Sequence, residues 1–178
     1  MAGLVSLEDI QSLYAARGSR RYGEDIAQIE HALQCAALAE AEGAAPSMVV
    51  AALLHDIGRL LEDSADVETD AAHDRVGAAA LGALFGAAVC EPIALHVAAK
   101  RYLCAKNPLY LAALSPTSQA SLRLQGGPFD AQEAAAFETA PYWREALALR
   151  RFDDLGKQDE PVRRSFDDFV SLMRSLLT

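Results

Sequence analysis

The stretch AALLHDIG (residues 51–58) decides how this chain is interpreted. It is apolar up to an adjacent imidazole and carboxylate, His55 and Asp56, and Pro46 stands ahead of it at a position suited to the first turn of a helix. We therefore predict a helix over 47–61 that is buried on most sides. An ionised aspartate in such a helix is costly unless it is paired or bound to a cation. Neutral imidazoles and carboxylates together are typical metal ligands.

Helical spacing of apolar residues continues along most of the chain, and no segment shows the alternation of a strand. Ser6 and Asp130 are suited to cap helices, and Gly156 is suited to end one. We expect one all-α domain, a helical bundle over residues 1–178. The expected helices are 6–16, 24–42, 47–61, 74–85, 91–104, short pieces within 107–124, 130–137, 142–152 and 161–177.

Composition excludes several classes of protein. The net charge of −9 argues against nonspecific binding to nucleic acid. No stretch approaches the roughly 18 apolar residues of a membrane span, and the N-terminus lacks the pattern of a signal peptide. The three cysteines, Cys35, Cys90 and Cys104, form no CxxC pair, and we interpret them as reduced thiols of a cytoplasmic protein. The oligomeric state is left open.

The chain has four histidines, and His55 is the one with an adjacent aspartate. A single histidine on an apolar helix is more often a core residue than a ligand. His31 before the His55-Asp56 pair and Asp153 after it give the order H…HD…D, which resembles the HD-domain superfamily. The two other histidines, His73 and His96, exceed the needs of one metal ion but suit a second.

Three further strings resemble one branch of that superfamily. They are GEDIAQIEHALQCA (residues 23–36), HVAAKRYL (96–103) and LQGGP (124–128). The chain resembles, over about residues 20–157, the mixed-valent diiron HD-domain oxygenases that cleave carbon–phosphorus bonds. Their substrates are 2-amino-1-hydroxyethylphosphonate and its N-trimethylated analogue. The resemblance implies a small organophosphonate as substrate, with phosphate and either glycine or glycine betaine as products.

The resemblance also implies a cofactor, two iron ions in the Fe(II)/Fe(III) state, with O2 as co-substrate. The first iron would take His31, His55, Asp56 and Asp153. The second would take Asp56, His73 and His96. Asp56 would then bridge the ions, with one carboxylate oxygen on each.

Substrate contacts follow from the same resemblance. Lys100, four residues after His96 and so on the same helix face, would bind the phosphonate and is expected to be cationic at neutral pH. Glu24 would face the substrate ammonium, which makes Glu24 and Lys100 the expected catalytic residues. The other expected substrate contacts are Tyr22, Arg59, Ser121, Gln125 and Arg150.

Two positions depart from the family pattern. Tyr22 stands two residues before Glu24, where the family has three, and Arg21 occupies the aligned place. Arg59 stands where the family often has a histidine, and its planar fork is suited to a phosphonate.

Three alternatives stay open from the sequence. An HD-domain phosphohydrolase would use one Mn, Co or Zn ion to hydrolyse a phosphate ester. An inositol-type ring oxygenase would also use two irons. A noncatalytic helical binding module would need no metal at all. The choice between a primary amine and a trimethylammonio substrate is also open.

Overall fold

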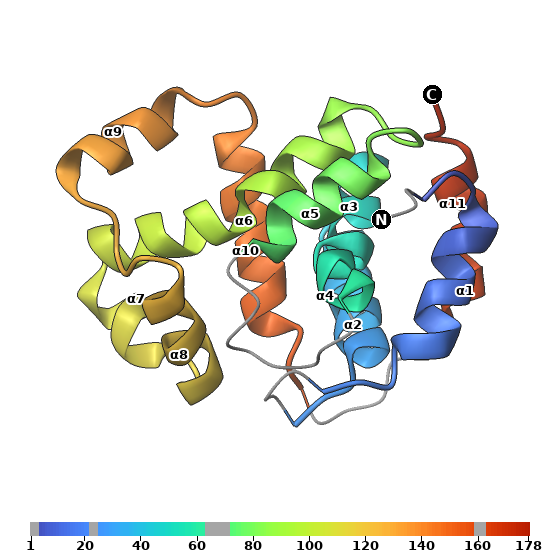
Figure 1. Ribbon diagram of the computed structural model, residues 1–178, viewed down its shortest axis with the longest axis horizontal. Coiled ribbons are helices and arrows are strands. Elements are labelled where there is room, and N and C mark those ends of the chain that lie inside the picture. The colour runs from blue at the N-terminus through green and yellow to red at the C-terminus, as the bar shows by residue number, and fades with distance from the viewer. Residues whose placement is uncertain (1–3, 22–24, 63–71, 159–162) are drawn as a thin grey trace.

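The computed structural model of the protein describes residues 4–21, 25–62, 72–158 and 163–178. Within these ranges the chain is helical, and the one β-type feature is an isolated bridge between Phe85 and Leu177 (Figure 1). The prediction of an all-α fold is confirmed. The elements are α1 (Leu7–Arg17), α2 (Gln28–Ala41), α3 (Pro46–Leu54), α4 (Ile57–Leu61), α5 (His73–Leu81), α6 (Ala87–Lys106), α7 (Pro108–Ala113), α8 (Pro116–Leu124), α9 (Ala131–Thr139), α10 (Trp143–Leu155), the 3-10 helix η2 (Phe166–Phe169) and α11 (Val170–Arg174).

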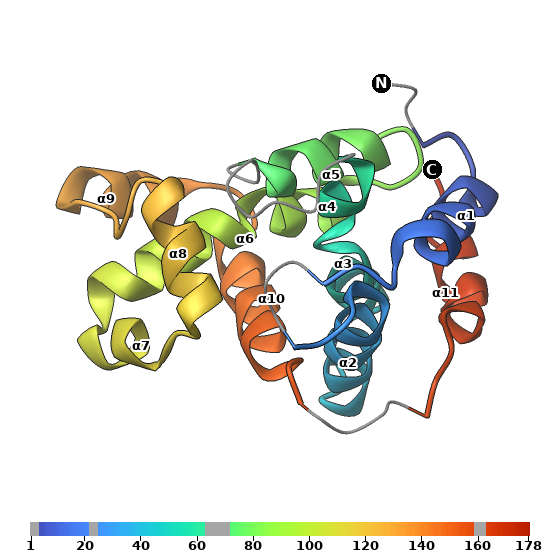
Figure 2. The same ribbon diagram turned by 60° about the horizontal axis from the view of Figure 1, so that its bottom comes forward.

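The long helix α6 crosses the molecule and packs against α3, α5 and α10, while α2 packs against α3. Helices α1 and α11 lie together at one end, and α7, α8 and α9 lie at the other (Figures 1 and 2). Helix α3 is at the centre of the largest apolar cluster, and its residues 50–54 have no exposed surface. The prediction of a helix buried on most sides therefore holds for α3.

Predicted helix caps are present in the structure. The Ser6 hydroxyl accepts a hydrogen bond from the backbone N–H of Asp9 at 3.1 Å, and Asp130 accepts one from Glu133 at 2.8 Å. Gly156 forms the C-terminal cap of α10, as expected. These local contacts satisfy backbone groups that a helix end leaves without partners.

The helix predicted over 47–61 is wrong in one respect, because it is broken. Helix α3 ends at Leu54, and α4 begins at Ile57. The periodicity hides this break because the residues on both sides of it are apolar and buried. The break turns out to be the feature that positions the metal-ligand candidates.

Other predicted bounds also need correction. The helix expected over 91–104 begins earlier, at Ala87, so Pro92 lies inside α6 and does not open it. The long helix expected over 161–177 is replaced, among the described residues, by the short η2 and α11. The helix expected from residue 24 begins at Gln28. In the described part of the chain, no helix is long and apolar enough to cross a membrane.

Candidate metal centre

The break between α3 and α4 directs two neighbouring side chains into one space. In an unbroken helix, adjacent residues point about 100° apart. Here His55 is the C-terminal cap of α3 and Asp56 precedes α4, both are buried, and His55 Nε2 lies 3.7 Å from Asp56 Oδ1. Gly58 then allows α5 to approach, since a Cβ at this position would lie 2.0 Å from the carbonyl oxygen of His73. His73, the first residue of α5, is thereby brought beside Asp56.

The first ligand group consists of His31 from α2, His55 and Asp153 from α10. The Nε2 atoms of His31 and His55 are 3.2 Å apart. Asp153 Oδ1 is 3.3 Å from His31 Nε2 and 3.9 Å from His55 Nε2. Side chains from three helices therefore present one nitrogen or oxygen each to a common point.

The second ligand group consists of Asp56, which precedes α4, His73 from α5 and His96 from α6. The Nε2 atoms of His73 and His96 are 3.0 Å apart, and Asp56 Oδ1 is 3.2 Å from the first and 3.7 Å from the second. Asp56 Oδ1 is also 3.7 Å from His55 Nε2 in the first group. Asp56 therefore lies between the two groups, as a bridging residue must.

The donor atoms of both groups suit a bound cation. Three of the rings place Nδ1 against a backbone carbonyl: His31 on Gly156 at 2.7 Å, His55 on Ala52 at 2.9 Å and His96 on Ile93 at 2.8 Å. A carbonyl only accepts, so in the neutral form of each ring the proton lies on Nδ1 and Nε2 presents a lone pair. Ligand atoms about 2.1 Å from one ion at ordinary angles stand about 3.0–3.4 Å apart, which the shortest distances in each group match. Converging lone pairs in a buried site repel each other until a cation joins them.

Burial and neighbouring charges keep most of these groups in the form that binds a metal. Burial lowers the pKa of His55 and, together with His73, holds that of His96 well below its usual value, so both rings are neutral. His31 is the exception: burial lowers its pKa, but Cys35 and Asp153 together raise it well above its usual value, so a metal ion at this position must displace a proton from the ring. Burial opposes ionisation of the two aspartates. The Arg59 guanidinium nevertheless holds the pKa of Asp56 well below its usual range, and Arg150 does the same for Asp153.

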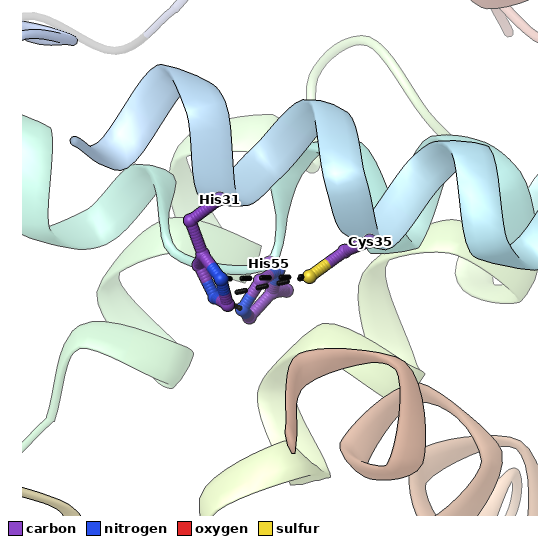
Figure 3. A group of neighbouring side chains, drawn as sticks. All are labelled: His31, Cys35 and His55. Atoms are coloured by element: carbon purple, nitrogen blue, oxygen red, sulfur yellow. Dashed lines mark hydrogen bonds between the residues drawn. The ribbon is translucent and has the colours of Figure 1, made fainter. Parts of the chain in front are cut away.

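Cys35 is an unexpected neighbour of the first group. It lies one turn after His31 on α2, and its sulfur is 3.7 Å from His31 Nδ1 (Figure 3). The thiol donates to the carbonyl of Phe152 at 3.4 Å, and burial raises its pKa. Because the thiol stays protonated while Asp153 stays ionised, Asp153 is the better anionic ligand.

The arginine contacts differ from expectation. Asp56 was expected to give one carboxylate oxygen to each ion, but Oδ2 pairs with Arg59 Nε at 3.0 Å and Oδ1 alone faces both groups. Arg150 was expected at the substrate anion. It is buried, and it donates to Asp153 Oδ2 at 2.6 Å, to Asp154 and to the Tyr110 hydroxyl at 2.9 Å. Its clearest role in this geometry is to orient Asp153.

A cavity of about 500 Å³, including its open mouth, adjoins both ligand groups. Its wall holds Lys100, which is buried and donates to the Ser121 hydroxyl at 2.9 Å. Burial, and after it the nearby Arg150, lower the pKa of Lys100 to about 7. Burial therefore weakens the charged form of Lys100, and the expectation that this lysine is cationic at neutral pH stays a prediction.

The remaining predicted residues divide into three sets. Arg59 and Ser121 line the cavity. Gln125 does not, and its buried amide has no hydrogen-bond partner among the described residues. Tyr22 and Glu24 lie outside the described residues. Residues that sequence reasoning missed also line the cavity, among them Ser118 and Lys157. The position of Lys157, four residues after Asp153, was the available signal.

Comparison with known proteins agrees with this geometry. The HD domain family matches residues 29–123. The chain is 38% identical over 176 residues to the [1-hydroxy-2-(trimethylamino)ethyl]phosphonate dioxygenase (glycine-betaine-forming) of Leisingera caerulea, covering 96% of this chain and 90% of that protein. It is 48% identical over 145 residues to the hydroxymethylphosphonate dioxygenase of Gimesia maris, covering 79% of this chain and 72% of that protein.

This chain belongs to the HD-domain phosphonate dioxygenases. It is an oxygenase of phosphonate metabolism, and the predicted family is confirmed. The HD match ends at residue 123, before Asp153, whereas the alignment with the L. caerulea enzyme covers nearly the whole chain. The structure therefore adds what the family match leaves out, the contribution of α10 to the first ligand group.

Proposed function

We propose that this HD-domain phosphonate dioxygenase uses O2 and two iron ions to cleave the carbon–phosphorus bond of 2-amino-1-hydroxyethylphosphonate or its N-trimethylated analogue. The products are phosphate and glycine or glycine betaine. For the primary amine the atoms balance with one O2, since both oxygen atoms appear in the products. The observation that carries the proposal is a pair of two-histidine, one-carboxylate groups, joined by Asp56 beside a cavity with a buried lysine.

The donor set supports iron as the metal. His31, His55 and Asp153 would hold one ion, Asp56, His73 and His96 the other, and Asp56 would contact both. Two histidines and one carboxylate with open positions are typical of non-haem iron oxygenases. When bound, the irons supply O2 activation and Lewis acidity toward the substrate hydroxyl.

The cavity supports a substrate that carries a phosphonate. Lys100 lies one helical turn from His96, so its ammonium faces the same space as the second ligand group. The Ser121 hydroxyl holds that ammonium in place. A dianion bound there raises the proton affinity of Lys100, and the lysine in turn orients the anion relative to the metal centre.

Hydroxymethylphosphonate is a second candidate substrate, favoured by the 48% identity to a relative named for it. The same atom balance would give formate and phosphate. The three candidates share a hydroxyl on the carbon that carries phosphorus, and they differ in the substituent at that carbon. Lys100 and the ligand groups would serve all three in the same way.

The test combines metal analysis with a substrate panel. Protein loaded with Fe(II) without oxygen, then exposed to air with each hydroxyphosphonate, should contain close to two irons per chain and release phosphate. His73→Ala should lose one iron and the activity, while Cys35→Ala, next to the first group but not expected to bind, should keep both irons. Anaerobic hydrolysis of phosphate esters, with hydroxyphosphonates inert, would instead support the phosphohydrolase.

A further inference from the structure

Four cationic side chains line the cavity, and they have two kinds of partner. Arg59 pairs with Asp56, and Arg150 pairs with Asp153, so both arginines face carboxylates of the ligand groups. Lys100 and Lys157 donate to hydroxyl groups of α8, and the charge of Asp153 acts on both of them. The lysines therefore bring positive charge to the wall of the cavity that α8 forms.

The two lysines are arranged alike. Lys100 Nζ lies 2.9 Å from Ser121 Oγ, and Lys157 Nζ lies 3.3 Å from Ser118 Oγ. The two serines are three residues apart on α8, both are buried, and both line the cavity. One face of α8 thus holds two ammonium groups side by side, although they come from α6 and from the end of α10.

The backbone around Lys157 is fixed, although this residue lies beyond the end of α10. Before it, the Gly156 carbonyl accepts from His31 Nδ1 at 2.7 Å. After it, Gln158 exchanges two hydrogen bonds with the buried side chain of Gln34, at 2.7 Å and 2.9 Å. Both contacts fasten the segment to α2. A cation on a fixed backbone loses less entropy when it binds an anion than one on a loose tail.

The presence of lysine rather than arginine at these two positions also suits an anion with two charges. The chain has three lysines and 13 arginines, yet two of the three lysines line this cavity. A compact ammonium can approach one oxygen of a tetrahedral anion without the space that a planar guanidinium needs. The two lysines also repel each other, and Lys157 is among the groups that lower the pKa of Lys100. A dianion between them would relieve this repulsion.

We propose that Lys157 is a second phosphonate-binding residue, which holds the substrate anion together with Lys100 between α8 and the metal centre. This inference rests on the proposed function for the identity of the anion. It assigns Lys157 a part in specificity, because a tetrahedral dianion meets both ammonium groups, whereas a carboxylate of the same length carries one charge fewer.

The test is a charge series at this position: Lys157→Arg, Lys157→Met and Lys157→Glu. Lys106→Met is the control, since Lys106 is an exposed lysine at the end of α6 that pairs with Glu138 at 3.1 Å. Methylphosphonate, which lacks the reacting hydroxyl, serves as the probe for calorimetric binding to the iron-loaded protein without oxygen. Lys157→Met should weaken this binding about tenfold to hundredfold, Lys157→Glu should weaken it further, and Lys157→Arg, which keeps the charge but needs more space, should fall between Lys157→Met and the wild type.

Iron content and thermal stability should not change across the series, and KM for the hydroxyphosphonate should rise with the Kd of methylphosphonate. Unchanged methylphosphonate binding in Lys157→Met would overturn the inference, as would an equal loss in Lys106→Met, or no binding to the wild type. If methylphosphonate binding depends on Lys157 but the wild-type protein releases no phosphate from hydroxyphosphonates, the inference is supported and the proposed function is contradicted.

Discussion

The two ligand groups are built from the same residue types, but different forces hold them. In the first, side chains are oriented by polar contacts: His31 by the Gly156 carbonyl and Asp153 by the Arg150 guanidinium. In the second, His96 and Asp56 also have polar partners, but the position of His73 depends on close packing of backbones, because Gly58 lets α4 approach α5 at His73. Both groups use charge and hydrogen bonds, and the second depends in addition on the absence of a methyl group at Gly58.

This difference means that a mutation outside the ligand residues should be able to disturb one group and leave the other intact. Loss of a charge near α10 should disturb the first group and spare the second. An added methyl group at the contact of α4 and α5 should do the reverse. Asp56 belongs to the second group and faces the first, so it limits how independent they can be.

The largest effect is expected for Arg150→Met. The change leaves the buried Asp153 and the neighbouring Asp154 without their cation, and breaking a buried ion pair costs about 3–5 kcal/mol. Urea denaturation of the metal-free protein measures this loss, and iron analysis should show depletion of one ion. Arg151→Met is the control, because this neighbouring arginine pairs with Glu42 at the surface, where a pair contributes up to about 1 kcal/mol. Equal stability of the two variants would contradict the role given to Arg150.

A smaller effect on stability is expected for Gly58→Ala. The new Cβ would stand 2.0 Å from the carbonyl oxygen of His73 and 3.0 Å from the backbone nitrogen of Gly77, so α4 and α5 must separate. Overpacking of this kind costs about 1–3 kcal/mol or more. Gly82→Ala at the end of α5 is the control, because its nearest atom would be 3.5 Å away. Iron analysis of Gly58→Ala should show loss of one ion, and the His31 group should keep the other. Two fully occupied ions in Gly58→Ala would refute the steric account of the second group.

The sequence was sufficient for the helical class and for the set of ligand candidates. Helical spacing and capping residues are local signals, and Ser6 and Asp130 act as caps where expected. The ligand candidates stood out because four histidines in 178 residues are few and one has an adjacent aspartate. Their assignment to two metal ions came from the resemblance to known oxygenases.

What the sequence could not predict depends on contacts between distant segments. The break after Leu54 is hidden, because an apolar run has the same pattern whether or not the helix continues. The pairs of Arg150 with Asp153 and Asp154 are local to α10, at three and four residues apart, but the contact of Arg150 with Tyr110 forms only where α7 meets α10. Lys157 stands four residues after Asp153 but beyond the end of α10, so the spacing alone did not place it, and its contact with Ser118 is seen only in the structure.

The smallest expected effect concerns the protonation of Lys100. This lysine belongs to neither ligand group. Its pKa of about 7 belongs to the protein without a bound anion, and the protonated form is the one that attracts a phosphonate. As pH rises through 7, the protonated fraction falls, so kcat/KM should fall by up to about tenfold per pH unit. The phosphonate itself also ionises in this range and obscures the trend.

Comparison with Lys100→Arg removes that complication. A guanidinium stays protonated throughout the range, and the substrate titrates identically in both assays. The ratio of wild-type to Lys100→Arg kcat/KM should therefore be constant below pH 6 and should decline above pH 7, even if arginine is the weaker residue at every pH. Iron content measured at each pH separates this trend from loss of metal. A flat ratio from pH 6 to 9 would mean that Lys100 keeps its proton throughout, and that burial beside Ser121 does not lower its pKa as the surroundings imply.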